Sequence, residues 1–502
     1  MTQLTVEKRY LETIAPEARG EAPYELPVTP ALIANASTDC TSCGSAGCHT
    51  SGCPMENGIP EINKLYQDGV TFAENGEVDK ADRSFEAAFE ESWKTNRWGL
   101  LTGRLCPSDK LCEGSCIYEG TQQGSILIRG IEYDTHARAW KNGWVPDLEQ
   151  KEKLDKSIAI VGSGFGAIAA AEMAFEQGYD VTIYDRAPVA GGLGAIGIPR
   201  LKMDFEDVER YTGRLKEAGV KFVMNTSIGN VANDNTVAFS QLAEEHDAII
   251  VATGKYKPKS TISAENGGEH TIQALDFLSR QSLEGIHIPH NYDDLTLDAH
   301  GKRVVVIGGG DTAMDCLRTA KTIQNAESST LVYYKDQSKM AAGGKEVQAA
   351  TEEGAGFEFN ASTDHIVQRD DGVKEVHLAD GKVLEADMVI QAVGFDPENL
   401  HSMFGDDQLP IHEKSGGLVV QDDNKVIIPG TDPFEAQIGV PMAGLVTEYK
   451  TAAGKVVPIA GVGDIVVNKQ GQGPALAVHA LAGGRDVVRM LNDQLLHLDK
   501  VA

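Results

Sequence analysis

The sequence lacks the long apolar runs and the positive charge that would indicate membrane or nucleic-acid binding. No stretch approaches the roughly 18 apolar residues of a membrane-spanning helix, and the N-terminal stretch has no signal-peptide core. Lysine and arginine number 45 against 74 acidic residues, so the formal net charge is −29. This charge repels phosphates, so neither nucleic acid nor an anionic membrane is expected as a partner. We expect a cytoplasmic protein of two or three domains.

Cysteine is scarce, and it is almost confined to one region. Beyond position 116 only Cys316 remains, so the C-x-x-C of a thioredoxin-reductase-like dithiol enzyme is missing from the later chain, and Cys316 is expected to pack in a core. A reducing compartment disfavours disulfides, and clustered thiols therefore indicate a metal. The clustered cysteines are Cys40, Cys43, Cys48, Cys53, Cys106, Cys112 and Cys116.

Zinc and iron–sulfur clusters are the two candidates for this region. A four-cysteine zinc site also opens with C-x-x-C, but the run C-x2-C-x4-C-x4-C lacks the second, distant pair of a zinc ribbon. Iron–sulfur clusters are favoured because the rest of the chain carries nucleotide motifs that need an electron acceptor. Seven cysteines leave two four-ligand clusters one ligand short.

Residues 1–39 are expected to form an extended arm, and residues 59–98 are expected to be helical.

The stretch 157–186 carries a dinucleotide-binding motif. SIAIV is typical of a buried parallel strand, and Gly162, Gly164 and Gly166 follow in the spacing G-x-G-x-x-G. A helix over 165–177 then directs its positive N-terminus at a pyrophosphate. The strand DVTIY ends at Asp185, about 20 residues on, where a carboxylate can bind ribose hydroxyls.

A second unit of the same kind covers 302–335. The strand VVVI leads into Gly308, Gly310 and Ala313, a G-x-G-x-x-A turn, followed by a helix and the strand STLVYY. Two such units in one chain indicate two dinucleotides that exchange electrons. After each unit we expect a buried strand with a glycine just after its end. These segments are DAIIVATG at 247–254 and EADMVIQAVGFDP at 385–397.

Three cysteine-region segments resemble a known family: CTSCGSAGCHTSGCPMENGIPEIN, LTGRLCPSDKLCEGSCIYEG and SILIRGIE. They are similar to the N-terminal domain of the glutamate synthase small subunit, which also opens dihydropyrimidine dehydrogenase. The resemblance implies two [4Fe-4S] clusters, one on Cys40, Cys43 and Cys48 and the other on the remaining four cysteines. It also implies that Glu132, sixteen residues beyond Cys116, supplies the missing ligand.

The resemblance extends over about 36–490 and assigns the cofactors. A G-D element at Gly463 and Asp464 and a helix that opens near Gly473 would complete the first unit, which makes it the FAD site and the second unit the NAD(P)H site. The cofactor residues so implied are Gly162, Gly164, Phe165, Gly166, Asp185, Arg186, Gly192, Leu193, Gly197, Ile198, Lys202, Ala252, Thr253, Gly254, Gly308, Gly310, Asp311, Thr312, Ala313, Tyr334, Lys335, Gly394, Gly463, Asp464, Gly473 and Ala475.

The expected fold is α/β, with two Rossmann-like domains after an α-helical iron–sulfur domain. We expect the cluster domain over 1–150, the FAD domain over 151–255 and 385–502, and the NAD(P)H domain inserted over 256–384. The expected function is that of an electron-input subunit that takes hydride from NAD(P)H and delivers single electrons to a larger oxidoreductase subunit. No general base is expected, because positioned cofactors carry the chemistry. The alternative is a self-contained reductase with its own small-molecule or ferredoxin acceptor.

The choice between NADH and NADPH depends on the segment after the second unit's last strand. NADPH-using relatives carry an arginine pair and a further arginine there, and guanidinium groups suit a 2′-phosphate. In this chain Tyr334, Lys335 and Gly344 occupy the three places. Lysines remain but no guanidinium does, so NADH is expected to be preferred, with use of both cofactors as the alternative.

Overall fold

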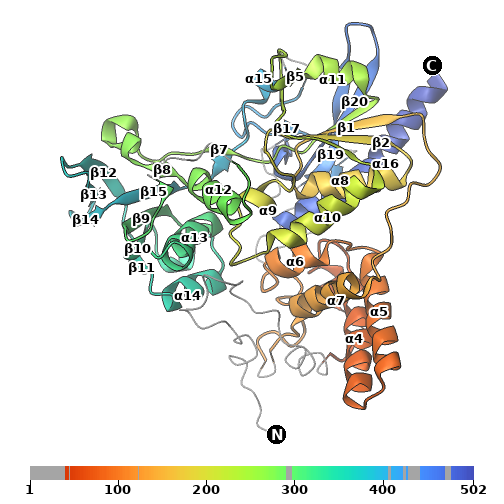
Figure 1. Ribbon diagram of the computed structural model, residues 1–502, viewed down its shortest axis with the longest axis horizontal. Helices are drawn as coiled ribbons and strands as arrows, with labels where there is room; N and C mark the ends of the chain where they lie inside the picture. The colour runs from red at the N-terminus through yellow and green to blue at the C-terminus, as the bar shows by residue number, and fades with distance from the viewer. Residues whose placement is uncertain are drawn as a thin grey trace.

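The computed structural model describes residues 40–44, 46–121, 124–289, 297–404, 409–421, 425–427, 441–469 and 476–501. These residues form a helical N-terminal part and two helix-covered sheets (Figure 1), which confirms the predicted α/β class. The extended arm expected over 1–39 lies outside the described residues. Within the described ranges, no helix has the length and apolar character needed to cross a membrane.

The N-terminal part is built on a pair of adjacent helices, α4 (Ile59–Glu74) and α5 (Val78–Trp93). Apolar residues at helical spacing meet between them, and the rings of Tyr66 and Phe85 lie 5.1 Å apart between centroids. The helical prediction for 59–98 is confirmed as far as Trp93, with a break between the two helices. The other helices of this part are α3 (Gly47–Thr50), α6 (Gly99–Leu105) and α7 (Ile128–Asn142).

The first sheet has seven strands, and its strands come from two distant parts of the chain. The order is β18-β19-β20-β6-β1-β2-β3, parallel from β20 to β3, while β19 runs antiparallel to both neighbours. The β-branched run of β1 is buried after its first residue, as predicted. The bounds are β1 (Ser157–Val161), β2 (Asp180–Tyr184), β3 (Lys221–Val223), β6 (Ala248–Val251), β18 (Lys425–Ile427), β19 (Pro441–Lys450) and β20 (Val456–Val462).

Helices α8 (Phe165–Glu176) and α16 (Ala477–Val501) pack against each other beside this sheet. Their contact is close, because a Cβ at Gly484 would lie 2.3 Å from the carbonyl oxygen of Gly166. Helix α10 (Phe205–Ala218) packs on α8. Shorter elements of this half are α9 (Leu193–Ile196), α11 (Phe239–Glu245), α15 (Leu400–Phe404), β4 (Ser227–Gly229), β5 (Thr236–Ala238), β17 (Leu418–Val419) and β21 (Val466–Val467).

The second sheet is parallel, with the order β11-β10-β9-β15-β8. Helices α12 (Ala274–Gly285), α13 (Asp311–Arg318) and α14 (Gly344–Glu352) accompany it, and a three-stranded meander, β12 (Thr363–Gln368), β13 (Lys374–Leu378) and β14 (Val383–Ala386), follows β11 in the chain. The sheet strands are β8 (Ile272–Gln273), β9 (Arg303–Gly308), β10 (Ser328–Tyr333), β11 (Gly356–Phe359) and β15 (Met388–Ala392).

The second sheet is inserted between β6 and the C-terminal strands of the first. The outgoing and returning segments pair as β7 (Lys257–Pro258) and β16 (Phe395–Asp396). The predicted boundary at 385 is too early, because β15 pairs with β9 and β8 and therefore belongs to the second sheet. The chain returns to the first half only after Ala392. We call the halves around the first and second sheets the flavin half and the nicotinamide half, after the cofactors expected there.

Candidate functional site

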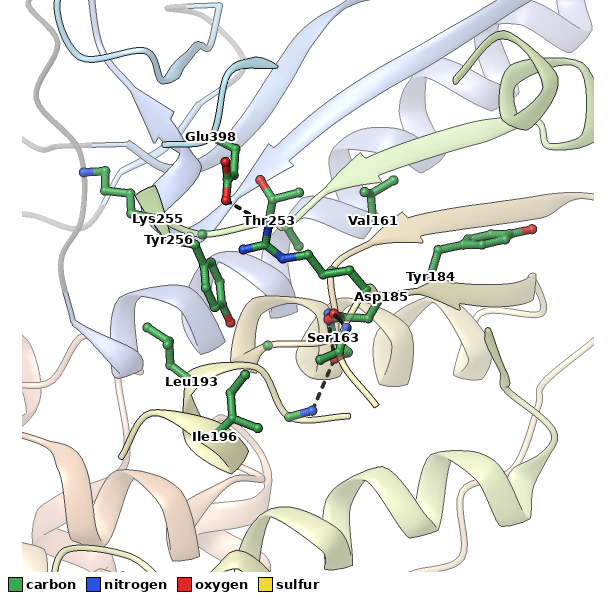
Figure 2. Close-up of a pocket in the computed structure, with 18 of the residues that line it drawn as sticks. Val161, Ser163, Tyr184, Asp185, Leu193, Ile196, Thr253, Lys255, Tyr256 and Glu398 are labelled. Carbon is green, nitrogen blue, oxygen red and sulfur yellow. Dashed lines mark hydrogen bonds and ion pairs between the residues drawn. The ribbon is translucent and has the colours of Figure 1, made fainter. Parts of the chain in front are cut away.

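A cavity of about 1070 Å³ lies at the carboxyl ends of β1, β2 and β6 (Figure 2). Ligands in open α/β sheets bind at this edge. Segments far apart in the sequence close around it, including Tyr256, Glu398 and the β20 exit. The predicted residues that line it are Gly162, Gly164, Phe165, Gly166, Asp185, Arg186, Leu193, Ile198, Ala252, Thr253, Gly254, Gly463 and Asp464.

The glycine turn beside the cavity has the shape that a dinucleotide needs. Gly162 has φ +104°, and a Cβ there would lie 2.4 Å from the Ala252 carbonyl oxygen, so only glycine fits this tight turn. A Cβ at Gly164 would meet its nearest atom only at 4.0 Å, which leaves the backbone open to a pyrophosphate. Gly192, which does not itself line the cavity, packs behind Gly164.

Asp185 is held in a fixed orientation at the end of β2. One carboxylate oxygen accepts hydrogen bonds from the Ser163 amide and hydroxyl, at 2.7 and 2.6 Å, and the other accepts from the Ala187 amide at 2.8 Å (Figure 2). Oδ2 accepts two hydrogen bonds and Oδ1 accepts one, so Oδ1 keeps a lone pair for a ribose hydroxyl. Ser163 was not among the predicted residues, although its position between Gly162 and Gly164 is the signal that would have identified it.

The sequence prediction missed two further cavity residues, Tyr256 and Glu398. The Arg186 guanidinium lies 5.1 Å from the centroid of the Tyr256 ring and forms an ion pair with Glu398 at 2.9 Å. Burial raises the pKa of Tyr256, so its hydroxyl stays a neutral donor. Tyr256 follows the A-T-G exit of β6 by two residues, so extending that motif would have found it. Glu398 comes from the returning segment, and no local pattern identifies it.

Two polar groups in the cavity wall fit a bound hydroxyl-rich cofactor. Burial raises the pKa of Asp464 to about 6, and Lys255 opposes this shift. The Thr253 hydroxyl is buried and has no hydrogen-bond partner among the described residues. Such groups need a ligand partner, which FAD can supply through its ribityl chain and ribose. The cavity therefore fits FAD. The predicted residues Gly473 and Ala475 lie outside the described residues, and α16 is described from Ala477.

The second glycine turn repeats the backbone of the first. Gly308 has φ +150°, and a Cβ there would lie 2.3 Å from the Ala392 carbonyl oxygen, whereas a Cβ at Gly310 would meet nothing within 4 Å. Helix α13 begins at Asp311, continues through Thr312, and places Ala313 against the turn. This turn therefore fits a second dinucleotide, with its pyrophosphate at the start of α13.

Around the second turn, the surroundings are more open. Tyr334 is 60% exposed, and the Lys335 ammonium lies 4.7 Å from its ring centroid. The backbone amides of Ala341 and Ala342 both donate to the Gly309 carbonyl oxygen at 3.1 Å, so the loop after β10 lies against the turn. Gly394, at the exit of β15, has φ +100°.

Besides Gly192, two of the predicted flavin residues, Gly197 and Lys202, lie outside the cavity lining. Gly197 follows α9 and only its neighbours Ile196 and Ile198 line the cavity. The ammonium of Lys202 is engaged instead by carboxylates of the nicotinamide half: Nζ lies 2.7 Å from Asp315 Oδ1 and 3.3 Å from Glu346 Oε2.

The structure sorts the eight predicted metal ligands into two groups of four. Cys40, Cys43, Cys48 and Cys116 line one small pocket, which we call the outer group. Cys53, Cys106, Cys112 and Glu132 interact electrostatically with one another, which we call the inner group. The predicted assignment of Cys116 to the second cluster and Glu132 to the first is therefore wrong. Cys116 belongs with the first three cysteines, and Glu132 completes the other set.

The buried thiols would ionise only beside a positive partner. Burial raises the pKa of Cys53 to about 11 and of Cys48 to about 12, and those of Cys106 and Cys112 well above the usual value. Thiolates are the ligands of iron, so a bound cluster would have to stabilise the ionised form here. Among the described residues, no three candidate ligands converge on the position of a single ion. A [4Fe-4S] cluster needs no such convergence, because each iron takes its own ligand.

Polar residues around each group orient the ligands. The Glu132 carboxylate accepts hydrogen bonds from Thr102 Oγ1 at 2.5 Å and from Asn57 Nδ2 at 3.0 Å, which offset part of the rise in its pKa caused by burial. The backbone amide of Asn57 donates to Cys53 Sγ at 3.5 Å, and the side-chain Nδ2 of Asn63 donates to Cys40 Sγ at 3.6 Å. Hydrogen bonds to cluster sulfurs tune reduction potentials.

Comparisons with known proteins agree with both parts of this arrangement. The family model described as pyridine nucleotide-disulphide oxidoreductase matches residues 156–430 and 122–268, and that described as dihydropyrimidine dehydrogenase domain II, 4Fe-4S cluster, matches 21–144. The fold and its sites are those of an NAD(P)H-dependent flavin oxidoreductase with an iron–sulfur domain.

Individual relatives narrow this class. The glutamate synthase [NADPH] small chain of Azospirillum brasilense is 34% identical, covering 77% of this chain and 80% of its own. Its counterpart from Escherichia coli is 33% identical, covering 78% of this chain and 84% of its own. The chain belongs to the family of the glutamate synthase small chain.

Proposed function

We propose that this chain is an electron-input subunit. It takes hydride from NAD(P)H bound at the second glycine turn onto FAD bound in the cavity, and it passes single electrons through two [4Fe-4S] clusters to a larger oxidoreductase subunit. The observation that carries this proposal is the presence in one chain of a large cavity beside a glycine turn, a second glycine turn of the same kind and two four-ligand groups. FAD accepts two electrons and releases them singly, which links nicotinamide to the clusters.

Each part of the chain has one task in this proposal. The cluster domain covers 1–150, and the FAD domain starts at 151 and resumes after the second sheet. In the cavity, Gly164 admits the pyrophosphate, and Asp185 and Asp464 accept hydroxyls. At the second turn, Gly310 and the start of α13 hold the nicotinamide dinucleotide. The inner and outer groups hold one cluster each.

Packing supports the inner group as the first to receive electrons. Cys53 and Cys106 contact the same hydrophobic core as α8 and α16 of the flavin half, whereas the outer group packs with the core of α4 and α5. Arg485 of α16 donates to the carbonyl oxygens of Met55 and Thr95, at 2.9 and 3.1 Å, and so joins the flavin half to the loop after Cys53. Electrons then leave through the outer group, beside which Ile117 is 53% exposed.

The partner and the nicotinamide follow from the relatives and from one loop. The relatives are small chains of glutamate synthase, so the proposed partner is a subunit like the large chain of that enzyme. The relatives' names specify NADPH, whereas here Tyr334 and Gly344 stand where a guanidinium would bind the 2′-phosphate. We therefore propose that NADH is the preferred donor.

Anaerobic flavin reduction and native co-purification test this function. Either nicotinamide should reduce the bound flavin in one rapid step, and a larger iron–sulfur or flavin subunit should co-purify with the chain and accept its electrons. A chain that purifies alone and reduces a ferredoxin or a small molecule directly would establish the self-contained reductase instead.

A further inference from the structure

Lys202 lies at the boundary between the flavin half and the nicotinamide half. It follows α9 of the flavin half, and its ammonium forms ion pairs with Asp315 of α13 and Glu346 of α14. The three side chains are 14%, 9% and 24% exposed, so water screens these pairs little. Lys202 thus joins the segment beside the cavity to two helices of the other half.

The two helices that Lys202 reaches are themselves tied together. Arg318 of α13 is fully buried and forms ion pairs at 2.9 Å with Glu346 and with Glu353, which follows α14. Helix α13 starts at the second glycine turn, directly after Gly310. The position of Lys202 therefore affects where the dinucleotide site of the nicotinamide half sits relative to the cavity.

The same boundary brings the nicotinamide half to the cavity wall. Helix α12 packs against α9, and Leu275 and Leu283 of α12 line the cavity together with Leu193 and Ile196 of α9. Packing of these leucine and isoleucine side chains is non-directional, so it does not by itself fix one orientation. The ion pairs made by Lys202 tie one point of the flavin half to two carboxylates on α13 and α14, and breaking them would leave buried charges without a partner.

We propose that Lys202 is a positioning residue for hydride transfer. Its pairs with Asp315 and Glu346 hold the nicotinamide half in the orientation from which the nicotinamide reaches the flavin. This inference rests on the proposed function. Lys202 does not line the cavity, so its effect is on distance and not on chemistry. Misplacement by 1 Å costs about 100-fold in rate for reactions that depend on alignment.

The test is stopped-flow flavin reduction with the FAD-loaded full chain. Lys202→Met keeps the side-chain length but removes the charge, and it should lower the limiting reduction rate about 10- to 100-fold, with a smaller change in the Kd of NADH and unchanged FAD content. Lys202→Arg should restore most of the rate. Asp315→Asn added to Lys202→Met should restore part of it, because it removes a carboxylate that has lost its partner.

Lys153→Met is the matched control, because Lys153 and Asp180 form an exposed pair at 3.1 Å within the flavin half. It should leave the rate unchanged. An unchanged rate in Lys202→Met, or a loss that follows FAD release and that arginine does not rescue, would overturn the inference. Absence of flavin reduction in the unaltered protein with both nicotinamides would instead overturn the proposed function.

Discussion

The two glycine-rich turns have nearly the same backbone but different surroundings. In each turn, a Cβ on the first glycine would clash with a carbonyl oxygen at the end of the neighbouring strand, that of Ala252 for Gly162 and that of Ala392 for Gly308. The second glycine of each turn has no chain atom closer than 4.0 Å to such a Cβ. Around the first turn, distant segments line a cavity of about 1070 Å³, whereas the second is bordered by a 60% exposed Tyr334. The difference fits our proposal that the first turn holds a resident cofactor and the second a substrate that leaves after each turnover.

The largest effects are expected from substituting the second glycine of each turn, Gly164 or Gly310, because this should affect FAD binding and nicotinamide binding separately. A Cβ at Gly164 would meet its nearest chain atom only at 4.0 Å, and a Cβ at Gly310 would meet nothing within 4 Å, so a valine at either place should project into the space expected for the dinucleotide. Gly164→Val should purify without FAD. Gly310→Val should keep FAD but lose about 100-fold in kcat/KM for NADH, the equivalent of about 3 kcal/mol. Flavin absorbance and steady-state kinetics measure both effects.

Gly213→Ala is the control for these substitutions, since a Cβ at Gly213 in α10 also meets nothing within 4 Å. It should keep both FAD and activity. Loss of FAD in Gly310→Val, or retention of FAD in Gly164→Val, would contradict the assignment of the two turns.

Removing an inner-group ligand should show that hydride transfer from NADH to the flavin does not require the clusters. Cys112→Ala should abolish the inner cluster and the onward transfer of electrons, because hydride transfer precedes cluster reduction. NADH-to-dye activity at the flavin should remain largely intact. Equal loss of both activities would mean that the cluster domain serves as a structural support for the cavity.

The buried acid of the first turn's cavity should make the FAD-free protein sensitive to pH. Burial raises the pKa of Asp464 from 3.8 to about 6, so its contribution to stability is present below the unfolded value and is lost as the pH rises through about 6. Asp464→Asn should therefore gain stability relative to the unaltered chain over that range, by at most about 3 kcal/mol.

Denaturant unfolding of FAD-free protein at several pH values measures this difference. A stability difference for Asp464→Asn that does not change with pH would show that the carboxylate is not desolvated.

The smallest expected effect concerns nicotinamide selectivity at the second turn. Tyr334→Arg supplies the guanidinium that this chain lacks, and it should raise kcat/KM for NADPH relative to NADH by about 10-fold. Steady-state comparison of the two nicotinamides measures the ratio. If the unaltered chain already prefers NADPH strongly, Lys335 and its neighbours bind the 2′-phosphate and the interpretation of this loop is wrong.

The sequence predicts local features of this protein well and pairings across the chain less well. The two glycine turns were predictable because strand, turn and helix are contiguous in the sequence. The sequence does not indicate which sheet contains β15, because a buried apolar strand fits the parallel part of either sheet. Cys116 and Cys112 lie four residues apart yet serve different groups, and the sequence offers no signal for that divergence. The ion pairs of Lys202 were not predictable, because its carboxylate partners lie more than 100 residues away.

The measurement that tests the central claim most directly is the cofactor content of anaerobically purified protein. An electron-input subunit with two four-ligand groups should contain about eight irons, about eight sulfides and about one FAD per chain. About four irons would mean that only one group holds a cluster. Zinc in place of iron, or a protein without flavin, would contradict the account as a whole.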